Sequence, residues 1–358
     1  MALKVGIQLY SVRDEMKKDP INAIRQVAEI GYKNLEFASS NADTDPGVGF
    51  GVSVEDMQKL LKETGANLIS GHIRPINEET IDPMIAYHTQ VGTKYLGQSA
   101  DFYTGYDQLM ERCEYYNWAG KKLSEHGIKF LIHNHYHEFQ KLNGKEILFH
   151  IMDNTDPNYV SFELDTFWAM RGGMDPLAVM DRLGDRLKLI HQKDFSKTSD
   201  SPINLWTVND PNVLVTWDSF GKGSDHKDFC EIGTGIMDIQ SIINKGNELG
   251  AEYIVLEQDH TQLTQMESVR ISMDSFHKFS CMRKCRFMSE SYKNLFNLLI
   301  FSKASKFKRL FYYFRKILFA VRFLFNIFYS VPSYDISRIY AVFIGVSWTH
   351  KAVGCHKD

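Results

Sequence analysis

Two patterns of apolar and polar positions alternate along roughly the first 280 residues. Short apolar runs alternate with segments whose apolar positions recur every three to four residues. The first pattern predicts buried strands and the second predicts amphipathic helices. Eight runs are predicted to be strands, at residues 4–12, 34–39, 67–73, 94–100, 129–136, 160–167, 187–195 and 253–259.

The segments between these runs carry helix end signals. Residues 20–31 begin with Pro20 and end with Gly31, and residues 53–65 begin with Ser53 and end with Gly65. Proline and serine favour the first positions of a helix, whereas glycine favours its end. Further helices are predicted at residues 106–127, 175–184, 238–250 and 264–279.

Repeated alternation of strand and helix indicates parallel pairing, because parallel strands need a long crossover connection. Eight such units in about 280 residues predict a (β/α)8 TIM barrel. An open, doubly wound sheet is the alternative. No GxGxxG motif follows the first strand, so a dinucleotide-binding fold has no support.

A long insertion, residues 196–237, follows the seventh predicted strand. Loops of this length inside a compact domain are usually functional or disordered. Because the insertion carries Trp206, Trp217 and Phe220, we predict an ordered flap over the site. A plain surface excursion is the alternative.

Charge divides the chain into two parts. From Arg283 to the end there are 14 Lys and Arg against 3 Asp and Glu, so residues 1–282 are acidic within a chain of net charge −3. We therefore predict a barrel domain over residues 1–282 and a basic, aromatic extension over residues 283–358. Charges inside its apolar stretch disfavour a spanning helix. The extension is interpreted as a membrane-surface helix or, preferably, as sequence foreign to the enzyme.

Cysteine use and the N-terminus indicate the compartment. The five cysteines lack metal-type spacing, and the first residues are too short and too polar for a secretory signal. Both features predict a reduced, cytoplasmic setting for a barrel that is not membrane-bound. The acidity of residues 1–282 disfavours nucleic acid as a partner.

Polar side chains end most of the predicted strands, where a barrel of this kind places its active site. Buried charges are costly unless they are paired or metal-bound. Carboxylates and imidazoles at one end of four consecutive strands indicate a divalent metal with mixed oxygen and nitrogen ligands. The candidate ligands are Glu138, Asp165, His191 and Glu257.

The residue that the fifth strand contributes as a ligand is not decided by spacing alone. His133, His135 and His137 share one face if the strand stays regular, and Glu138 then points away. Glu138 reaches the centre only if the strand ends near His135, and otherwise His135 replaces it. A histidine cluster that is only hydrogen-bonded is the remaining interpretation.

Several motifs resemble the xylose isomerase-like TIM barrels and, within them, the sugar phosphate isomerase/epimerase family, which includes inosose dehydratases. The motifs are GIQLYSVRD, GYKNLEF, HNHYHEF, FELDTFWAMRGGMDP, HQKD, EIGTGIMD and VLEQD. The resemblance implies one catalytic divalent metal, with manganese expected and magnesium, cobalt or zinc as alternatives. It also implies the ligands Glu138, Asp165, His191 and Glu257, which decides the fifth strand in favour of Glu138.

The implied activity is isomerisation or epimerisation of a keto-sugar, sugar phosphate or related polyol through a metal-stabilised enediolate. Dehydration of a keto-sugar or inosose on the same site is the alternative. Glu138 and Glu257 would transfer the proton from opposite sides of the barrel mouth. Substrate contacts are expected from His72, His133, His135, Trp168 and Lys193.

Some of these roles have alternatives. His133 and His135 would otherwise orient the ligands, and Lys193 would otherwise pair with Asp194 or Glu163. A DNA-repair endonuclease and a non-catalytic sugar-binding barrel are the rival classes. A homo-oligomer is expected by analogy with relatives.

Overall fold

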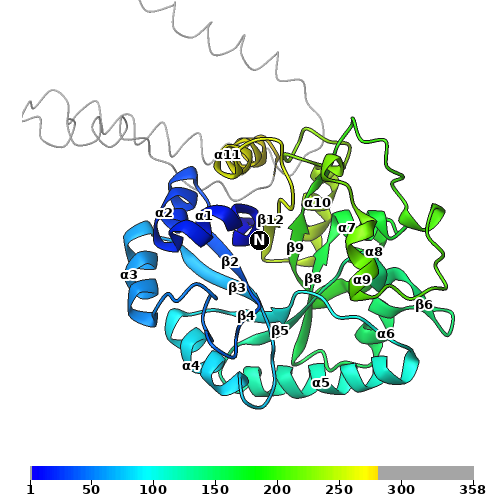
Figure 1. The fold of residues 1–358 in the computed structure, drawn as a ribbon, viewed down its shortest axis with the longest axis horizontal. Helices are drawn as coiled ribbons and strands as arrows, with labels where there is room; N and C mark the ends of the chain where they lie inside the picture. Colours follow the sequence, from blue (N-terminus) through cyan, green and yellow to red (C-terminus); the bar gives the residue numbers. More distant parts are fainter. Residues whose placement is uncertain (1, 281–358) are drawn as a thin grey trace, which may run out of the picture. The chain divides into compact units, whose positions relative to one another are not determined.

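The computed structural model of the chain describes residues 2–280. Eight parallel strands close into a barrel in the order β1-β12-β9-β8-β5-β4-β3-β2, and helices surround it (Figure 1). The predicted TIM barrel is therefore confirmed. The barrel strands are β1 (Lys4–Gln8), β2 (Asn34–Ser39), β3 (Asn67–Ile73), β4 (Tyr95–Gln98), β5 (Lys129–His133), β8 (Val160–Asp165), β9 (Leu187–Gln192) and β12 (Tyr253–Leu256).

The helices begin and end close to the capping signals in the sequence. Asp19 caps α2 by accepting a hydrogen bond from the Asn22 N–H, and Ser53 caps α3 through the Asp56 N–H. The helices of the described chain are α1 (Arg13–Lys18), α2 (Pro20–Ile30), α3 (Val54–Thr64), α4 (Ile81–Val91), α5 (Tyr106–Ser124), α6 (Ile147–Asp153), α7 (Thr166–Arg171), α8 (Pro176–Leu183), α9 (Trp217–Phe220), α10 (Ile239–Leu249) and α11 (Gln265–Phe276).

Apolar side chains fill two places in the barrel. The larger core lies between strands and helices, as expected for parallel strands covered on their outer face. A smaller cluster includes alternate residues of single strands, such as Tyr253 and Val255 of β12. Side chains two positions apart share one face of a strand, so the next residue in this alternation is Glu257, directly after β12.

The insertion is anchored at its base by two short strands. β10 (Asp194–Phe195) pairs antiparallel with β11 (Phe229–Cys230). The Asp194 carboxylate accepts backbone N–H groups from Gly233 and Gly235, each at 2.9 Å, and from Met237 at 3.1 Å. A Cβ on Gly235 would lie 2.2 Å from Asp194 Oδ1. These hydrogen bonds hold Asp194 of the HQKD motif against the glycines of the EIGTG motif.

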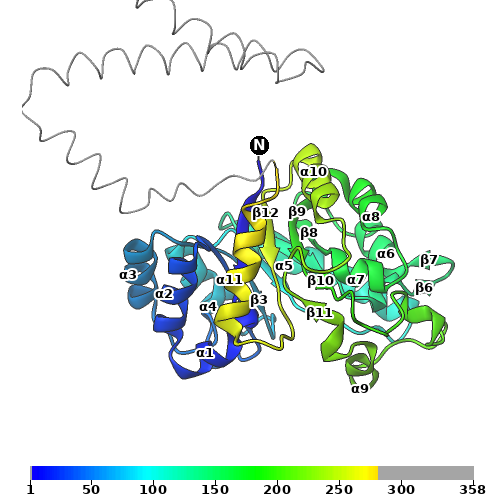
Figure 2. The same ribbon diagram turned by 90° about the horizontal axis from the view of Figure 1, so that it is seen from above.

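An aromatic cluster joins the insertion to the barrel. Tyr136, Phe167, Trp168, Phe195, Leu205 and Phe229 are buried together, and Trp206 and Phe220 pack against them. Figure 2 shows α9 and β11 at the end of the barrel away from the N-terminus, where the parallel strands finish. The insertion is therefore ordered where the site is expected.

The predicted extension, residues 283–358, lies outside the described residues, and so does its interpretation as a membrane-surface helix. Within residues 2–280, no helix has both the length and the apolar character needed to cross a membrane.

Candidate metal centre

The inner face of several strands changes from apolar to polar toward the C-terminal end. Leu131 is followed two residues later by His133, Leu189 by His191 and Val255 by Glu257, and the three apolar residues belong to one buried cluster. Because the side chains of a strand alternate, the polar residues form the next layer of the barrel interior.

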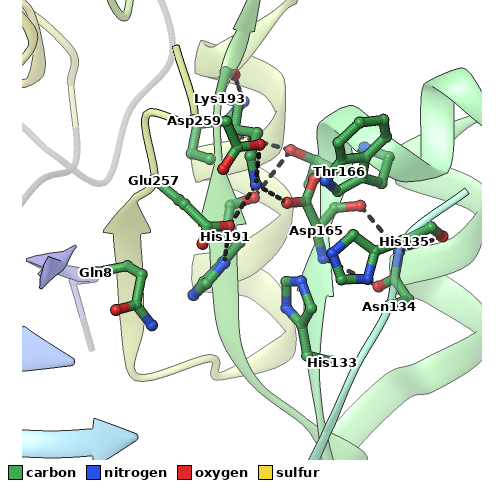
Figure 3. A network of polar contacts seen from close by, with 12 residues as sticks. Gln8, His133, Asn134, His135, Asp165, Thr166, His191, Lys193, Glu257 and Asp259 are labelled. Carbon is green, nitrogen blue, oxygen red and sulfur yellow. Dashed lines mark hydrogen bonds and ion pairs between the residues drawn. The ribbon is translucent and has the colours of Figure 1, made fainter. Parts of the chain in front are cut away.

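Two groups of buried donors meet in this layer. His133, Asp165, His191 and Glu257 each offer one atom, and these atoms lie within 4.8 Å of one another. The same holds for His72, His133, Glu163 and His191, so the groups share two histidines. Figure 3 shows Asp165, His191 and Glu257 turned toward one another around Lys193.

Lys193 supplies the positive charge of this centre. Its Nζ lies 2.5 Å from Asp165 Oδ2 and 3.6 Å from Asp259 Oδ2, and it also contacts Glu257 Oε2. Burial disfavours the ammonium ion, but the three carboxylates outweigh burial and raise the pKa of Lys193. The lysine is therefore charged and pairs with strand-end carboxylates, whereas Asp194 and Glu163 were the partners suggested by the sequence.

The carboxylates differ in their ionisation. Burial opposes the charge of Glu257, but Lys193 and His191 hold its pKa well below the ordinary value. Burial, opposed by Lys193 and assisted by Glu257, raises the pKa of Asp259 to about 7. Asp165 also caps α7, because its Oδ1 accepts the Trp168 N–H at 2.8 Å.

His191 has carboxylates at both ring nitrogens. Nδ1 lies 2.9 Å from Glu257 Oε2, and Nε2 lies 2.6 Å from Glu36 Oε1 and 3.2 Å from Glu163 Oε1. Burial disfavours the imidazolium ion, but these carboxylates raise the pKa of His191 well above its ordinary value. Binding of a cation at either nitrogen would release a proton.

His133 is a neutral donor with free capacity. Burial lowers its pKa to about 3, and neutral imidazole is the form that binds metals. Its Nδ1 is buried without a hydrogen bond, and the Glu163 carboxylate lies 3.6 Å away. The donor group therefore contains two imidazoles, one of which has an unpaired nitrogen, and two carboxylates. Such a set fits a divalent cation.

A second set of polar side chains contacts these donors. His72 Nε2 lies 2.6 Å from Glu163 Oε2, and the Gln8 amide donates to Glu36 Oε1 at 2.7 Å. All four side chains are buried. His72 lines the cavity, whereas Glu36 is fully buried and does not.

Glu138 lies outside both donor groups. β5 ends at His133, and a 3₁₀-helix, His137–Phe139, follows after a turn. The Glu138 carboxylate accepts the His135 N–H at 2.8 Å and lies 3.1 Å from His137 Nε2. Glu138 and His135 belong to neither donor group. β5 ends before His135, which is the condition under which Glu138 was expected to be a ligand, so that role stays a prediction. The β5 residue that belongs to both donor groups is His133.

A cavity of about 450 Å³ opens above the centre. Among the predicted substrate contacts, His72, His135 and Trp168 line it, as does Glu257, whereas His133 and Lys193 lie beneath its surface. Trp217 and Phe220 of the insertion form part of the wall, which confirms the flap.

Other lining residues were not predicted. They include Tyr10, Arg74, His226 and His260. Arg74 directly follows β3, and a charged residue at a strand end could have been predicted to line the site. The rings of His226 and His260 stack with centroids 3.7 Å apart, and no local pattern indicates a contact between such distant residues.

Residues 24–279 match the model of the xylose isomerase-like TIM barrel family, and the chain belongs to that family. An inosose dehydratase of Mesomycoplasma hyopneumoniae strain 7448 is 26% identical over 281 residues, which cover 76% of this chain and 84% of the relative.

Solved structures agree with this assignment. A sugar phosphate isomerase/epimerase from Parabacteroides distasonis superposes with a TM-score of 0.61 at 25% identity, covering 79% of this chain and 96% of that one. The IolI protein with a bound zinc atom shares the fold, with a TM-score of 0.57 at 12% identity, covering 76% of this chain and 96% of that one.

Proposed function

We propose that this chain is a divalent-metal-dependent isomerase or epimerase of a keto-sugar, sugar phosphate or related polyol. The observation that carries the proposal is the convergence of His133, Asp165, His191 and Glu257 beneath a cavity large enough for such a substrate. Three of these donors were expected from the sequence, and His133 replaces Glu138 as the fourth.

These four residues would hold the cation. When bound, a divalent cation supplies Lewis-acid stabilisation of negative charge on a carbonyl oxygen. Manganese remains our expectation from the family resemblance. The zinc atom in the IolI protein supports a cation in this fold, and a mixed nitrogen and oxygen donor set is compatible with both metals.

Glu257 is suited to accept the proton from carbon. It lines the cavity, and Lys193 and His191 keep its carboxylate ionised. A positioned carboxylate can deprotonate a carbon beside a carbonyl whose developing charge is stabilised. Lys193 acts here by orienting Asp165 and Glu257 and by balancing their charge.

Epimerisation needs a second proton carrier on another side of the substrate. His135 lines the cavity after β5, and its Nδ1 is buried without a hydrogen bond. The Glu138 carboxylate accepts the backbone N–H of His135 and so positions that residue. We therefore transfer to His135 the proton-carrying role expected of Glu138.

Dehydration is the second candidate, favoured by the inosose dehydratase relative at 26% identity. The first step is the same removal of a proton beside the carbonyl. If a hydroxyl group then leaves from the neighbouring carbon, the product is an unsaturated ketone and water.

The test is a screen of keto-sugars and inososes in deuterated water with the manganese-loaded full chain. We expect solvent deuterium at the carbon beside the carbonyl, and the product identifies epimerase or dehydratase. Glu257→Gln should lose exchange, whereas Arg25→Gln, which changes an exposed residue of α2, should not. No exchange with any compound, in protein whose metal content has been verified, would refute the proposal.

A further inference from the structure

We propose that the cavity wall formed by the ends of β2, β3 and β4 binds an oxyanion, a carboxylate or phosphate group of the substrate, through Arg74. This inference rests on the proposed function and names the substrate class: an anionic keto compound whose charged group lies away from its carbonyl.

The backbone of Arg74 is fixed at the end of β3. Its N–H donates to Ser39 O at 3.1 Å, and its carbonyl accepts the Ala42 N–H at 3.1 Å. Both bonds tie it to the segment at the end of β2, the neighbouring strand of the barrel. The half-buried side chain lines the cavity, so its position is defined before a ligand arrives.

The guanidinium of Arg74 has no carboxylate partner in the described part of the chain. Three described arginines do have one: Arg171 pairs with Asp228, Arg112 with Asp101 and Arg25 with Glu63. The contact of Arg74 is with the Trp217 ring of the insertion, 5.0 Å from the ring centroid. Stacking of this kind holds the planar group while leaving its N–H donors free.

The neighbouring strands add hydroxyl groups to the same wall. Ser40, directly after β2, and Ser99, directly after β4, line the cavity, as does Ser39, whose hydroxyl donates to Asn41 Oδ1 at 2.9 Å. A planar guanidinium with adjacent hydroxyl donors matches the oxygens of a carboxylate or phosphate. The wall therefore offers donors of the kind that an anionic group needs.

Charge is distributed unevenly around the cavity. Of the described residues that line it, Arg74 is the sole arginine or lysine, while Glu257 and Asp259 form the acidic side next to the metal centre. β1 and β2 separate β3 from β12, which leads into these two carboxylates. An anionic substrate thus has one favoured orientation, with its charged group at Arg74 and its carbonyl toward Glu257.

The first test compares fructose, fructose 6-phosphate and fructuronate, which share a skeleton and differ at carbon 6. We measure kcat/KM for deuterium exchange with the metal-loaded full chain. One anionic compound should exceed fructose by roughly 10- to 100-fold, the range of a hydrogen bond to a charged group. A faster reaction of fructose 6-phosphate than of fructose would indicate a phosphate site, and a faster reaction of fructuronate would indicate a carboxylate site. Arg74→Gln should lower kcat/KM for this anionic compound by a larger factor than for fructose, and Arg74→Lys should retain part of the advantage.

The second test needs no turnover. Inorganic phosphate is titrated calorimetrically into the full chain, its Arg74→Gln variant and the control Arg25→Gln. We expect wild type and control to bind phosphate equally. Arg74→Gln should bind phosphate at least about 10-fold more weakly. Unchanged binding by Arg74→Gln would overturn the inference.

The two proposals fail in different ways. If fructose exchanges deuterium as fast as its anionic analogues, the anion site is wrong and the proposed function stands. If no keto-sugar or inosose of the wider screen exchanges deuterium but phosphate binding still requires Arg74, the proposed function is wrong and the anion site stands.

Discussion

One buried arginine holds the insertion on the barrel, and its removal gives the sharpest structural prediction. Arg171, at the end of α7, is 1% exposed. Its Nη1 donates to Pro202 O at 2.8 Å, and its Nη2 donates to Gly223 O at 2.9 Å and to Asp228 Oδ2 at 3.0 Å. A single side chain therefore connects three points of the flap to the barrel.

Replacing Arg171 with methionine keeps most of its apolar volume and removes its charge. Loss of one partner from a buried ion pair costs about 3–5 kcal/mol, because the other charge stays buried without compensation. Asp228 keeps two hydrogen bonds, from the Ser199 hydroxyl at 2.6 Å and the Asp225 N–H at 2.9 Å. We therefore expect the lower end of this range, about 3 kcal/mol.

The assay is urea unfolding of the full chain together with limited proteolysis. Arg171→Met should lower the free energy of unfolding and produce new cleavage within residues 196–237. Combining Arg171→Met with Asp228→Asn should cost less than the sum of the single changes, by at least about 1 kcal/mol, because the pair is in direct contact.

Arg25→Met is the matched control. Its pair with Glu63 spans 3.0 Å on the exposed surface and should contribute less than about 1 kcal/mol. If Arg171→Met matched this control in stability, or if the two changes at Arg171 and Asp228 were additive, the anchoring role would be refuted.

Three further predictions concern the metal, acid stability and the extension. His133→Ala should lower metal affinity by 10-fold or more while Glu138→Gln retains nearly full metal content, measured by elemental analysis; the reverse result would restore Glu138 as the ligand. Burial lowers the pKa of His88 to about 3, against about 6.5 when unfolded, so the unfolded chain binds more protons between these values. Stability should fall by about 2 kcal/mol between pH 7 and pH 5 through this group, and His88→Gln should show a shallower pH dependence in urea unfolding; an equal slope would contradict this. Truncation after Met282 should leave folding and turnover unchanged, and lost activity would show that the extension belongs to the enzyme.

The eight strands could be predicted because each carries a local signal. β2 and β3 occur where the apolar runs placed them, at 34–39 and 67–73. The alternation of side chains also brought Asp165, His191 and Glu257 to one end of the barrel. Strand periodicity and helix end signals depend on neighbours in the chain, so the sequence by itself determined the fold class and which of these side chains meet at one end of the barrel.

Only the tertiary structure determined where side chains point beyond the strand ends and which distant residues meet. After the turn that follows His133, the Glu138 carboxylate accepts the His135 N–H, and strand alternation no longer predicts where such a side chain points. Arg74 meets Trp217 only because the closed barrel brings the end of β3 under the insertion. The placement of Glu138 therefore depends on a local turn, whereas the chemistry of the cavity wall depends on ring closure, which juxtaposes residues that are distant in the chain.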